Sequence, residues 1–299
     1  MHNWIEQLKN FENIDYYFYR QSPDTKFHIN KKNHFILVPC KTDTLLGTFE
    51  KTCQTLKIVD KLFEYDYIIR TNTSTYLNIP LINSFIQNAV NEDVCYAPQI
   101  CCAKEQGPYA YGLFPRGNAL IISKKLANVI TIQNMNKYKQ KYPLTYNHPD
   151  SDINLNTGYL DDGSIGFLLS CYFIENNMDV FEHFKMFGIF RSECLFADYP
   201  YDPHLGLHYT FMNKCMAIQF KHIGNNRIST NEQNYGDMVH RFMTKHGPYT
   251  DLTFTLDYIN KNRLCINYNG ITDIDGCKSV LKLDNDFNKL MQLNTYQEQ

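Results

Sequence analysis

Two adjacent carboxylates, Asp161 and Asp162, are the side chains in this 299-residue chain best placed to act as a base. They stand where residues 162–176 begin an apolar pattern with helical spacing, so both are expected at the amino end of a helix. A carboxylate held there can take the proton of a hydroxyl group while that hydroxyl attacks an electrophilic carbon. The simpler interpretation is that one of the pair caps the helix and interacts with its dipole.

A second polar group follows the apolar run of residues 65–70, which predicts a buried strand. The polar residues at its end are Arg70, Thr71, Asn72 and Ser74. Ligands of open α/β sheets bind at the carboxyl ends of the strands, and arginine forms paired hydrogen bonds with phosphate groups. The alternative is that Arg70 pairs with a nearby carboxylate while Asn72 caps the following turn.

The elements that must position these groups alternate between strand and helix. Strands are expected at residues 14–19, 34–38, 65–70, 94–100 and 216–221. Helices are expected at residues 4–11, 45–63, 79–90, 162–176 and 235–245, and also after a cap at Ser123. Loops are expected at 107–117 and 134–159, and a terminal hairpin or edge strands at 252–256 and 264–268. This order predicts an α/β protein with a largely parallel sheet flanked by helices.

Composition limits the classes of function. The formal net charge is -2, which gives no strong attraction to nucleic acid, and no apolar run is long enough to predict a membrane span. The amino terminus is neither basic nor apolar, so no signal peptide is expected. The 10 cysteines contain no C-x-x-C pair, which indicates reduced, buried thiols in a cytoplasmic protein. Frequent Asn, Lys, Ile and Tyr suit an AT-rich, viral genome, which would place the protein in host cytoplasm or virion.

Three segments in chain order carry a resemblance to a known family. They are residues 65–78, 113–123 (LFPRGNALIIS) and 160–166 (LDDGSIG). Their order and spacing resemble GT-A glycosyltransferases of the fringe and β1,3-galactosyltransferase type, including relatives in giant viruses. The resemblance covers residues 12–175, with a weaker similarity at 216–227. It implies a GT-A-like, Rossmann-type, mostly parallel sheet in residues 1–230 that lacks the family's first strand. A small C-terminal α+β extension, residues 231–299, would pack on it.

The resemblance also implies a role for each polar group. Asp162 would be the catalytic base, and Asp161 would orient it or bind the acceptor. The residues implied to surround the donor diphosphate are Arg70, Thr71, Asn72, Ser74 and Lys221. The residues implied to line the acceptor or sugar pocket are Arg116, Gly117 and Asn118. The structural alternatives are an ordinary turn at Gly117 and a solvated basic patch at Lys221.

The metal motif of the family is altered in this chain. Its acidic triplet would fall on Asn72, Thr73 and Ser74, whose side-chain oxygens are neutral. Mn²⁺ and Mg²⁺ prefer charged oxygen ligands, so metal binding is expected to be weak or absent. Asn72, Ser74 and His222 are the remaining metal candidates.

Together these features predict a glycosyltransferase that acts in glycan biosynthesis. It would move a sugar from a nucleotide-sugar donor, expected to be a UDP-sugar, to a hydroxyl of a glycan or protein acceptor with inversion. Because the acidic triplet is lost, the alternative is a catalytically inactive GT-A-like binding or scaffold protein.

Overall fold

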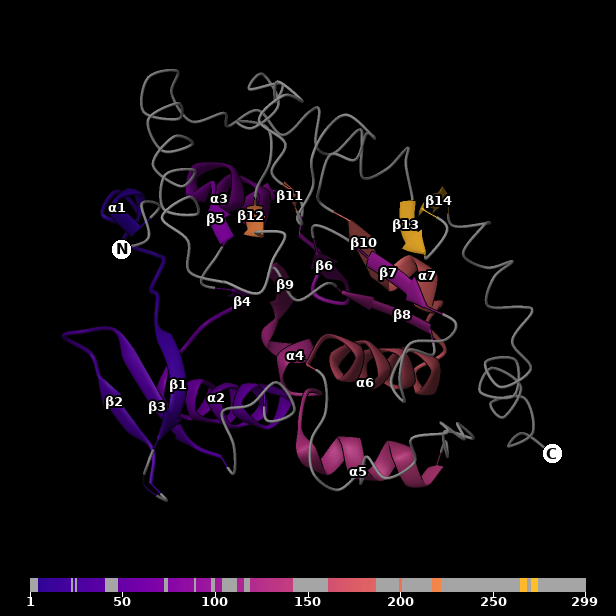
Figure 1. Cartoon of the computed structure of the whole chain (residues 1–299), viewed down its shortest axis with the longest axis horizontal. Coiled ribbons are helices and arrows are strands. Elements are labelled where there is room, and N and C mark those ends of the chain that lie inside the picture. Colours follow the sequence, from indigo (N-terminus) through magenta and orange to yellow (C-terminus); the bar gives the residue numbers. More distant parts are fainter. Residues whose placement is uncertain are drawn as a thin grey trace.

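The structure is a computed structural model of the chain, in which helices and short strands alternate (Figure 1). It describes residues 5–22, 24, 26–40, 48–72, 75–88, 90–97, 100–103, 112–115, 119–141, 161–186, 199–200, 217–221, 264–267 and 270–273. The described helices are α1 Ile5–Leu8, α2 Thr48–Leu62, α3 Ile79–Asn88, α4 Lys124–Ala127, α5 Ile132–Lys141, α6 Asp161–Glu175 and α7 Val180–His183. The fold of this part of the chain is therefore mixed α/β, as the sequence predicts.

The described strands are short and fall into four small sheets. They are β1 Phe18–Ser22, β2 His28–Asn30, β3 Phe35–Pro39, β4 Tyr67–Thr71, β5 Thr75–Leu77, β6 Cys95–Ala97, β7 Ile100–Ala103, β8 Gly112–Pro115, β9 Ala119–Ser123, β10 Phe184–Met186, β11 Tyr199–Pro200, β12 Ala217–Lys221, β13 Leu264–Asn267 and β14 Gly270–Asp273.

The central sheet has the strand order β10-β6-β9-β4. β10 and β6 are parallel, whereas β9 is antiparallel to both β6 and β4. The smaller sheets also contain antiparallel pairs, so the described pairings are mixed and the prediction of a largely parallel sheet is wrong for them. The reason is that a strand buried on both faces is an apolar run in either direction, and its local sequence does not state its direction.

β9 is a strand that the sequence pattern does not predict, because residues 113–123 suggest a turn that leads into a helix. All five of its residues are buried. The strand ends at Ser123, whose hydroxyl accepts a hydrogen bond from the backbone N–H of Leu126 at 3.1 Å. This bond caps α4 and confirms the predicted helix start.

The N-terminal sheet has the order β1-β3-β2 and lies against α2 (Figure 1). Ile36 and Val38 of β3 point toward Ile58 of α2 and form a small apolar cluster with it. Tyr17 and Tyr19 pack against the same cluster. The sheet thereby fixes the direction in which the side chains of β1 reach into the protein.

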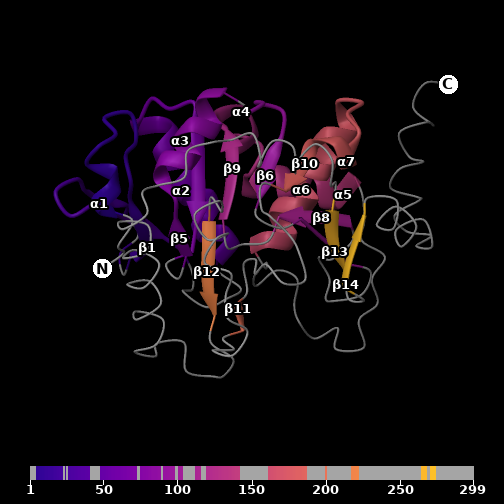
Figure 2. The same cartoon turned by 90° about the horizontal axis from the view of Figure 1, so that it is seen from above.

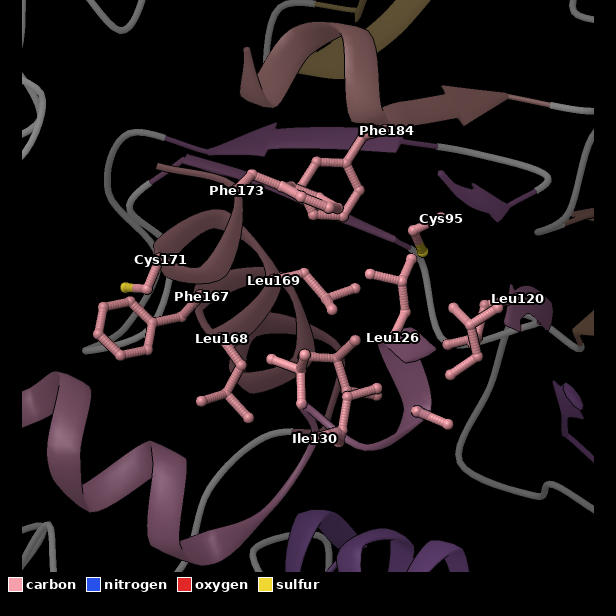
Figure 3. Packing of buried hydrophobic residues seen from close by; sticks show 14 of the residues in the cluster. Cys95, Leu120, Leu126, Ile130, Phe167, Leu168, Leu169, Cys171, Phe173 and Phe184 are labelled. Atoms are coloured by element: carbon pink, nitrogen blue, oxygen red, sulfur yellow. The ribbon is translucent and has the colours of Figure 1, made fainter. Parts of the chain in front are cut away.

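α6 runs through the main apolar core, and 11 of its 15 residues are buried. Figure 3 shows its apolar side chains spread over several sides of the helix, with Leu169 pointing toward Leu126 and Leu168 pointing to another side. The Phe173 and Phe184 rings lie edge to face with their centroids 5.5 Å apart. A helix that is apolar on most sides is a buried core helix, so its two ends are held rigidly.

α5 corrects another prediction, since residues 134–159 suggest a loop. Residues 132–141 form a helix whose Met135 and Tyr138 are buried against the main core. The apolar residues of this helix form a narrow stripe between Asn, Gln and Lys residues. The polar composition of the segment therefore led to the prediction of a loop. Residues 142–159 lie outside the described part.

Cys40, Cys53, Cys95 and Cys171 carry free thiols. Cys53, Cys95 and Cys171 are buried, as the sequence predicts for thiols inside apolar patterns, and burial raises the pKa of each. A raised pKa keeps a thiol protonated and unreactive. These three residues therefore serve packing.

The later strands return to the first half of the chain. β12 pairs antiparallel with β5, and β13 pairs with β14 as a hairpin and with β7 in parallel (Figure 2). The predicted helix 235–245, the strand 252–256 and most of the 107–117 loop lie outside the described residues. Among the described helices, none combines the length and apolar character needed to cross a membrane.

Candidate functional site

The candidate site is a charged cluster where β4 meets the amino end of α6. Arg70 is buried in β4, and its guanidinium Nη2 pairs with Oδ2 of Asp161. The two side chains are only 8% and 5% exposed, so the pair is shielded from water. Removing one partner of such a pair leaves an uncompensated charge in the interior, which makes the contact a strong constraint on geometry. This is the pairing that the sequence offers as the alternative role of Arg70.

Asp162 occupies a different environment from its neighbour. Its Oδ1 lies 3.9 Å from Nη1 of Arg70, and its side chain is 36% exposed. The first turn of α6 thus presents one carboxylate to the interior and one to solvent. Both also lie at the positive end of the helix dipole, which favours negative charge there.

Tyr19 and Thr52 complete the cluster from two further elements. Nε of Arg70 donates a hydrogen bond to the Tyr19 hydroxyl at 3.3 Å. That hydroxyl also lies 3.3 Å from Oγ1 of Thr52 on α2. A chain of polar contacts therefore runs from α2 through β1 and β4 to α6.

The chain of contacts shifts the pKa values of Tyr19 and Arg70. Burial raises the pKa of Tyr19, but the charge of Arg70 and the hydrogen bonds with Thr52 and Arg70 lower it to below its ordinary value. Burial lowers the pKa of Arg70, but the charges of Tyr19 and Asp162 and the hydrogen bond to Tyr19 raise it above its ordinary value. Arg70 therefore stays a cation throughout the physiological range.

Sequence reasoning missed Tyr19 and Thr52, although weak signals exist. Residues 14–19 predict a strand, and alternation along it places Tyr19 on one face with Tyr17. The observed strand, β1, begins only at Phe18. Thr52 lies between Phe49 and Cys53 on the buried side of α2, where a polar side chain needs a partner. Neither signal identifies Arg70 as the partner of Tyr19, or Tyr19 as the partner of Thr52.

Three buried side-chain oxygens on α6 have no hydrogen-bond partner among the described residues: Oδ1 of Asp161, Oγ of Ser164 and Oγ of Ser170. The first two are one turn apart on the same side of the helix. Buried polar atoms are nearly always hydrogen-bonded, to protein or to water. The polar cluster therefore extends along the first turn of α6.

The strand end at Asn72 is the second part of the predicted site. Thr71 and Asn72 are partly buried, and the carbonyl of Asn72 accepts hydrogen bonds from the Thr71 hydroxyl at 3.4 Å and from the Thr75 N–H at 3.1 Å. The chain turns here into β5, as expected for a strand that ends in a polar turn. Ser74 lies outside the described residues.

The three segments that carry the family resemblance meet in space. β4 from the first segment pairs with β9 from the second, so that Thr71 lies opposite Ala119. The third segment begins α6, which supplies Asp161 to Arg70 and packs against β8. Arg116, Gly117 and Asn118 themselves lie outside the described residues, although Ala119 directly follows them.

Lys221 is the last residue of β12. β12 runs antiparallel to β5 with Gln219 opposite Thr75, so its carboxyl end continues toward the turn that follows Asn72. The structure does not describe the side chain of Lys221, and His222 lies outside the described residues.

The described part of the candidate site offers few ligands that suit a divalent cation. Among the described residues, no group of three His, Cys, Asp or Glu side chains could hold a metal ion. Asn72 contributes a neutral amide oxygen, and the buried carboxylate of Asp161 is already paired with the Arg70 cation. Hard divalent cations bind charged oxygens, and a neighbouring guanidinium opposes them.

No protein-family model matches this chain, and no curated protein sequence matches it significantly. The resemblance to GT-A glycosyltransferases therefore rests on the three sequence segments.

Proposed function

We propose that the protein is a GT-A-like glycosyltransferase that transfers a sugar from a nucleotide-sugar donor to a hydroxyl acceptor with inversion. The observation that carries the proposal is the contrast between Asp161 and Asp162. Paired titratable groups in opposite environments are typical of acid–base sites, where one group is fixed and the other reacts. Asp161 is buried against Arg70, whereas Asp162 is open to solvent.

Asp162 is the proposed base. Inverting transfer needs a carboxylate that removes the acceptor's proton as its oxygen attacks the anomeric carbon on the face opposite the leaving diphosphate. The exposed fraction of Asp162 lets a hydroxyl reach its carboxylate, and the rigid core helix behind it limits its movement. Holding the two reacting groups in one geometry is itself a large part of catalysis.

The donor side of the proposal uses Thr71, Asn72, Ser74 and Lys221 without a resident metal. The leaving diphosphate needs positive charge, which Lys221 at the end of β12 would supply. Arg70 acts from behind this surface, because its guanidinium is buried on Asp161 and direct contact with phosphate would require breaking that pair. Arg116, Gly117 and Asn118 would shape the sugar pocket.

Calorimetry with a panel of UDP- and GDP-sugars, with and without Mn²⁺, tests the proposal on the unmodified protein. Binding of one donor at equal affinity with and without Mn²⁺ is the expected result. Failure of every donor to bind would end the enzyme hypothesis.

Asp162→Asn tests the base. Transfer should fall by about 100-fold or more, since general-base catalysis contributes roughly 100- to 10,000-fold, while donor affinity stays near that of the wild type. Asp66→Asn is the matched control, because Asp66 is exposed just before β4 and lies outside the cluster. Survival of full turnover in Asp162→Asn would reassign the base.

A second candidate function is a catalytically inactive GT-A-like binding or scaffold protein. It is favoured by the neutral residues in place of the acidic triplet and by the use of Arg70 as a structural partner of Asp161. This candidate predicts that the wild-type protein transfers no sugar from any donor of the panel, including a donor that it binds.

A further inference from the structure

We infer that Tyr19 is a positioning residue whose hydroxyl sets the orientation of the Arg70 guanidinium, and through it the two carboxylates at the start of α6. Its effect on Arg70 stands on the geometry alone. Its effect on sugar transfer rests on the proposed function.

The contacts of Arg70 explain why the Tyr19 hydroxyl affects the orientation of the guanidinium. A guanidinium is a flat, rigid group whose donors point in fixed directions. Nη2 is paired with Asp161 and Nη1 lies 3.9 Å from Asp162, so both carboxylates lie at the outer edge of the group. The Tyr19 hydroxyl holds Nε, at the inner edge, at 3.3 Å. With both edges held, the group cannot pivot about the Asp161 contact.

Tyr19 is itself fixed, which lets it act as a reference point. Its ring packs against the cluster of Ile36, Val38 and Ile58, and its backbone is paired with Ile36 in the N-terminal sheet. Thr52 on α2 lies 3.3 Å from the hydroxyl and sets its direction. The N-terminal sheet, which holds neither carboxylate, is thereby coupled to the candidate site.

Tyr17, which lies just before β1, provides a matched control in the same part of the N-terminal region. Its ring packs against the same apolar cluster, but its ring contacts are with His34 and Phe63. Tyr17→Phe and Tyr19→Phe each remove one hydroxyl and keep the ring. A difference between them therefore reports on the hydroxyl of Tyr19 and not on packing of the N-terminal sheet.

The first test measures Arg70 directly by NMR. Hydrogen exchange of the Arg70 Nε–H, assigned with an Arg70→Lys variant, should be about 5-fold faster in Tyr19→Phe, because a hydrogen bond worth about 1 kcal/mol slows exchange by that factor. Tyr17→Phe should leave the exchange rate unchanged, and Thr52→Val should give an intermediate rate. Exchange in Tyr19→Phe within twofold of the wild type would overturn the inference.

The second test measures transfer with the donor that calorimetry identifies. Tyr19→Phe should lower kcat by about 10- to 100-fold with the donor KM unchanged, since small misplacements of reacting groups have effects of that order. A purely structural role would instead lower the amount of folded protein and leave the kcat of the folded fraction unchanged. If the wild type transfers no sugar, the proposed function fails, while the Nε–H measurement still decides the role of Tyr19.

Discussion

The two ends of α6 each hold a carboxylate near basic side chains, but they do so in different ways. At the amino end, Asp161 is 5% exposed and pairs with the single buried cation of Arg70. At the carboxyl end, Glu175 is 18% exposed and accepts hydrogen bonds from Lys137 at 3.1 Å, Tyr138 at 3.0 Å and Lys141 at 2.7 Å. The second network joins α6 to α5 at the surface.

The buried pair at the amino end fixes a geometry, whereas the network at the carboxyl end adds small increments of stability. A buried ion pair is costly to desolvate, and its loss from one side only is severe. Ion pairs with exposed lysines contribute little each and are screened by salt. The side chains at the amino end of α6 are thus held in one arrangement, which suits a functional site. The network at the carboxyl end connects α6 to α5.

Arg70→Met should have the largest effect on stability. It leaves the carboxylate of Asp161 buried without its cation, so the free energy of unfolding should fall by about 3–5 kcal/mol. Urea unfolding followed by circular dichroism measures this. Lys137→Met is the control at the other end of α6 and should cost under about 1 kcal/mol.

The double variant Arg70→Met with Asp161→Leu sharpens the same comparison. Replacing both charges by apolar groups should recover most of the loss, to within about 1 kcal/mol of the wild type. If Arg70→Met and Lys137→Met cost the same, the two ends of α6 do not differ in the way described.

Phe173→Ala tests the apolar middle that connects the two ends. Phe173 is fully buried against Phe184, and truncation should leave a cavity that lowers the free energy of unfolding by about 3 kcal/mol. Tyr172→Ala, at a partly exposed neighbour, should cost clearly less in the same urea titration. Equal losses would mean that the middle of α6 is not a packed core.

Glu175→Gln tests the surface network through its dependence on pH. Burial raises the pKa of Glu175, but hydrogen bonds from Lys141, Lys137 and Tyr138 lower it to below its ordinary value of 4.5. The folded protein therefore binds fewer protons than the unfolded chain as the pH falls past 4.5, and stability decreases there. The contribution is complete above that pH and is lost as the pH passes below the pKa of the folded state.

Urea unfolding of wild type and Glu175→Gln between neutral and acidic pH measures this contribution. The variant should lose about 1 kcal/mol near neutral pH and nothing once the wild-type carboxylate is protonated, so the two stability curves should meet in acid. Curves that stay parallel would show that Glu175 titrates no differently in the folded and unfolded states.

Ser164→Ala should have the smallest effect. The Ser164 hydroxyl is fully buried and has no partner among the described residues, so removing it deletes an unsatisfied group. The free energy of unfolding should stay within about 0.5 kcal/mol of the wild type or rise. A loss above about 1 kcal/mol would show that a buried water satisfies Ser164 and belongs to the polar cluster.

Only part of the local structure of the described residues could be predicted from the sequence, because many of the strands are short. The strand near residues 65–70, the helix that starts at the aspartate pair and the cap at Ser123 all follow from short-range patterns. The helix at residues 132–141 could not, because its apolar stripe is narrow, and the strand at 119–123 could not, because its apolar run continues toward a helix cap. For the site, the sequence named Arg70 and both aspartates but not Tyr19 or Thr52.

The sequence by itself determined which residues could do chemistry and on which kinds of elements they lie, because side-chain periodicity and capping act over a few residues. Only the tertiary structure decided which of them meet. Arg70 finds Asp161 across 91 positions and Tyr19 across 51, and such contacts depend on how sheets and helices pack. The same packing gave two neighbouring aspartates opposite environments, which no local pattern distinguishes.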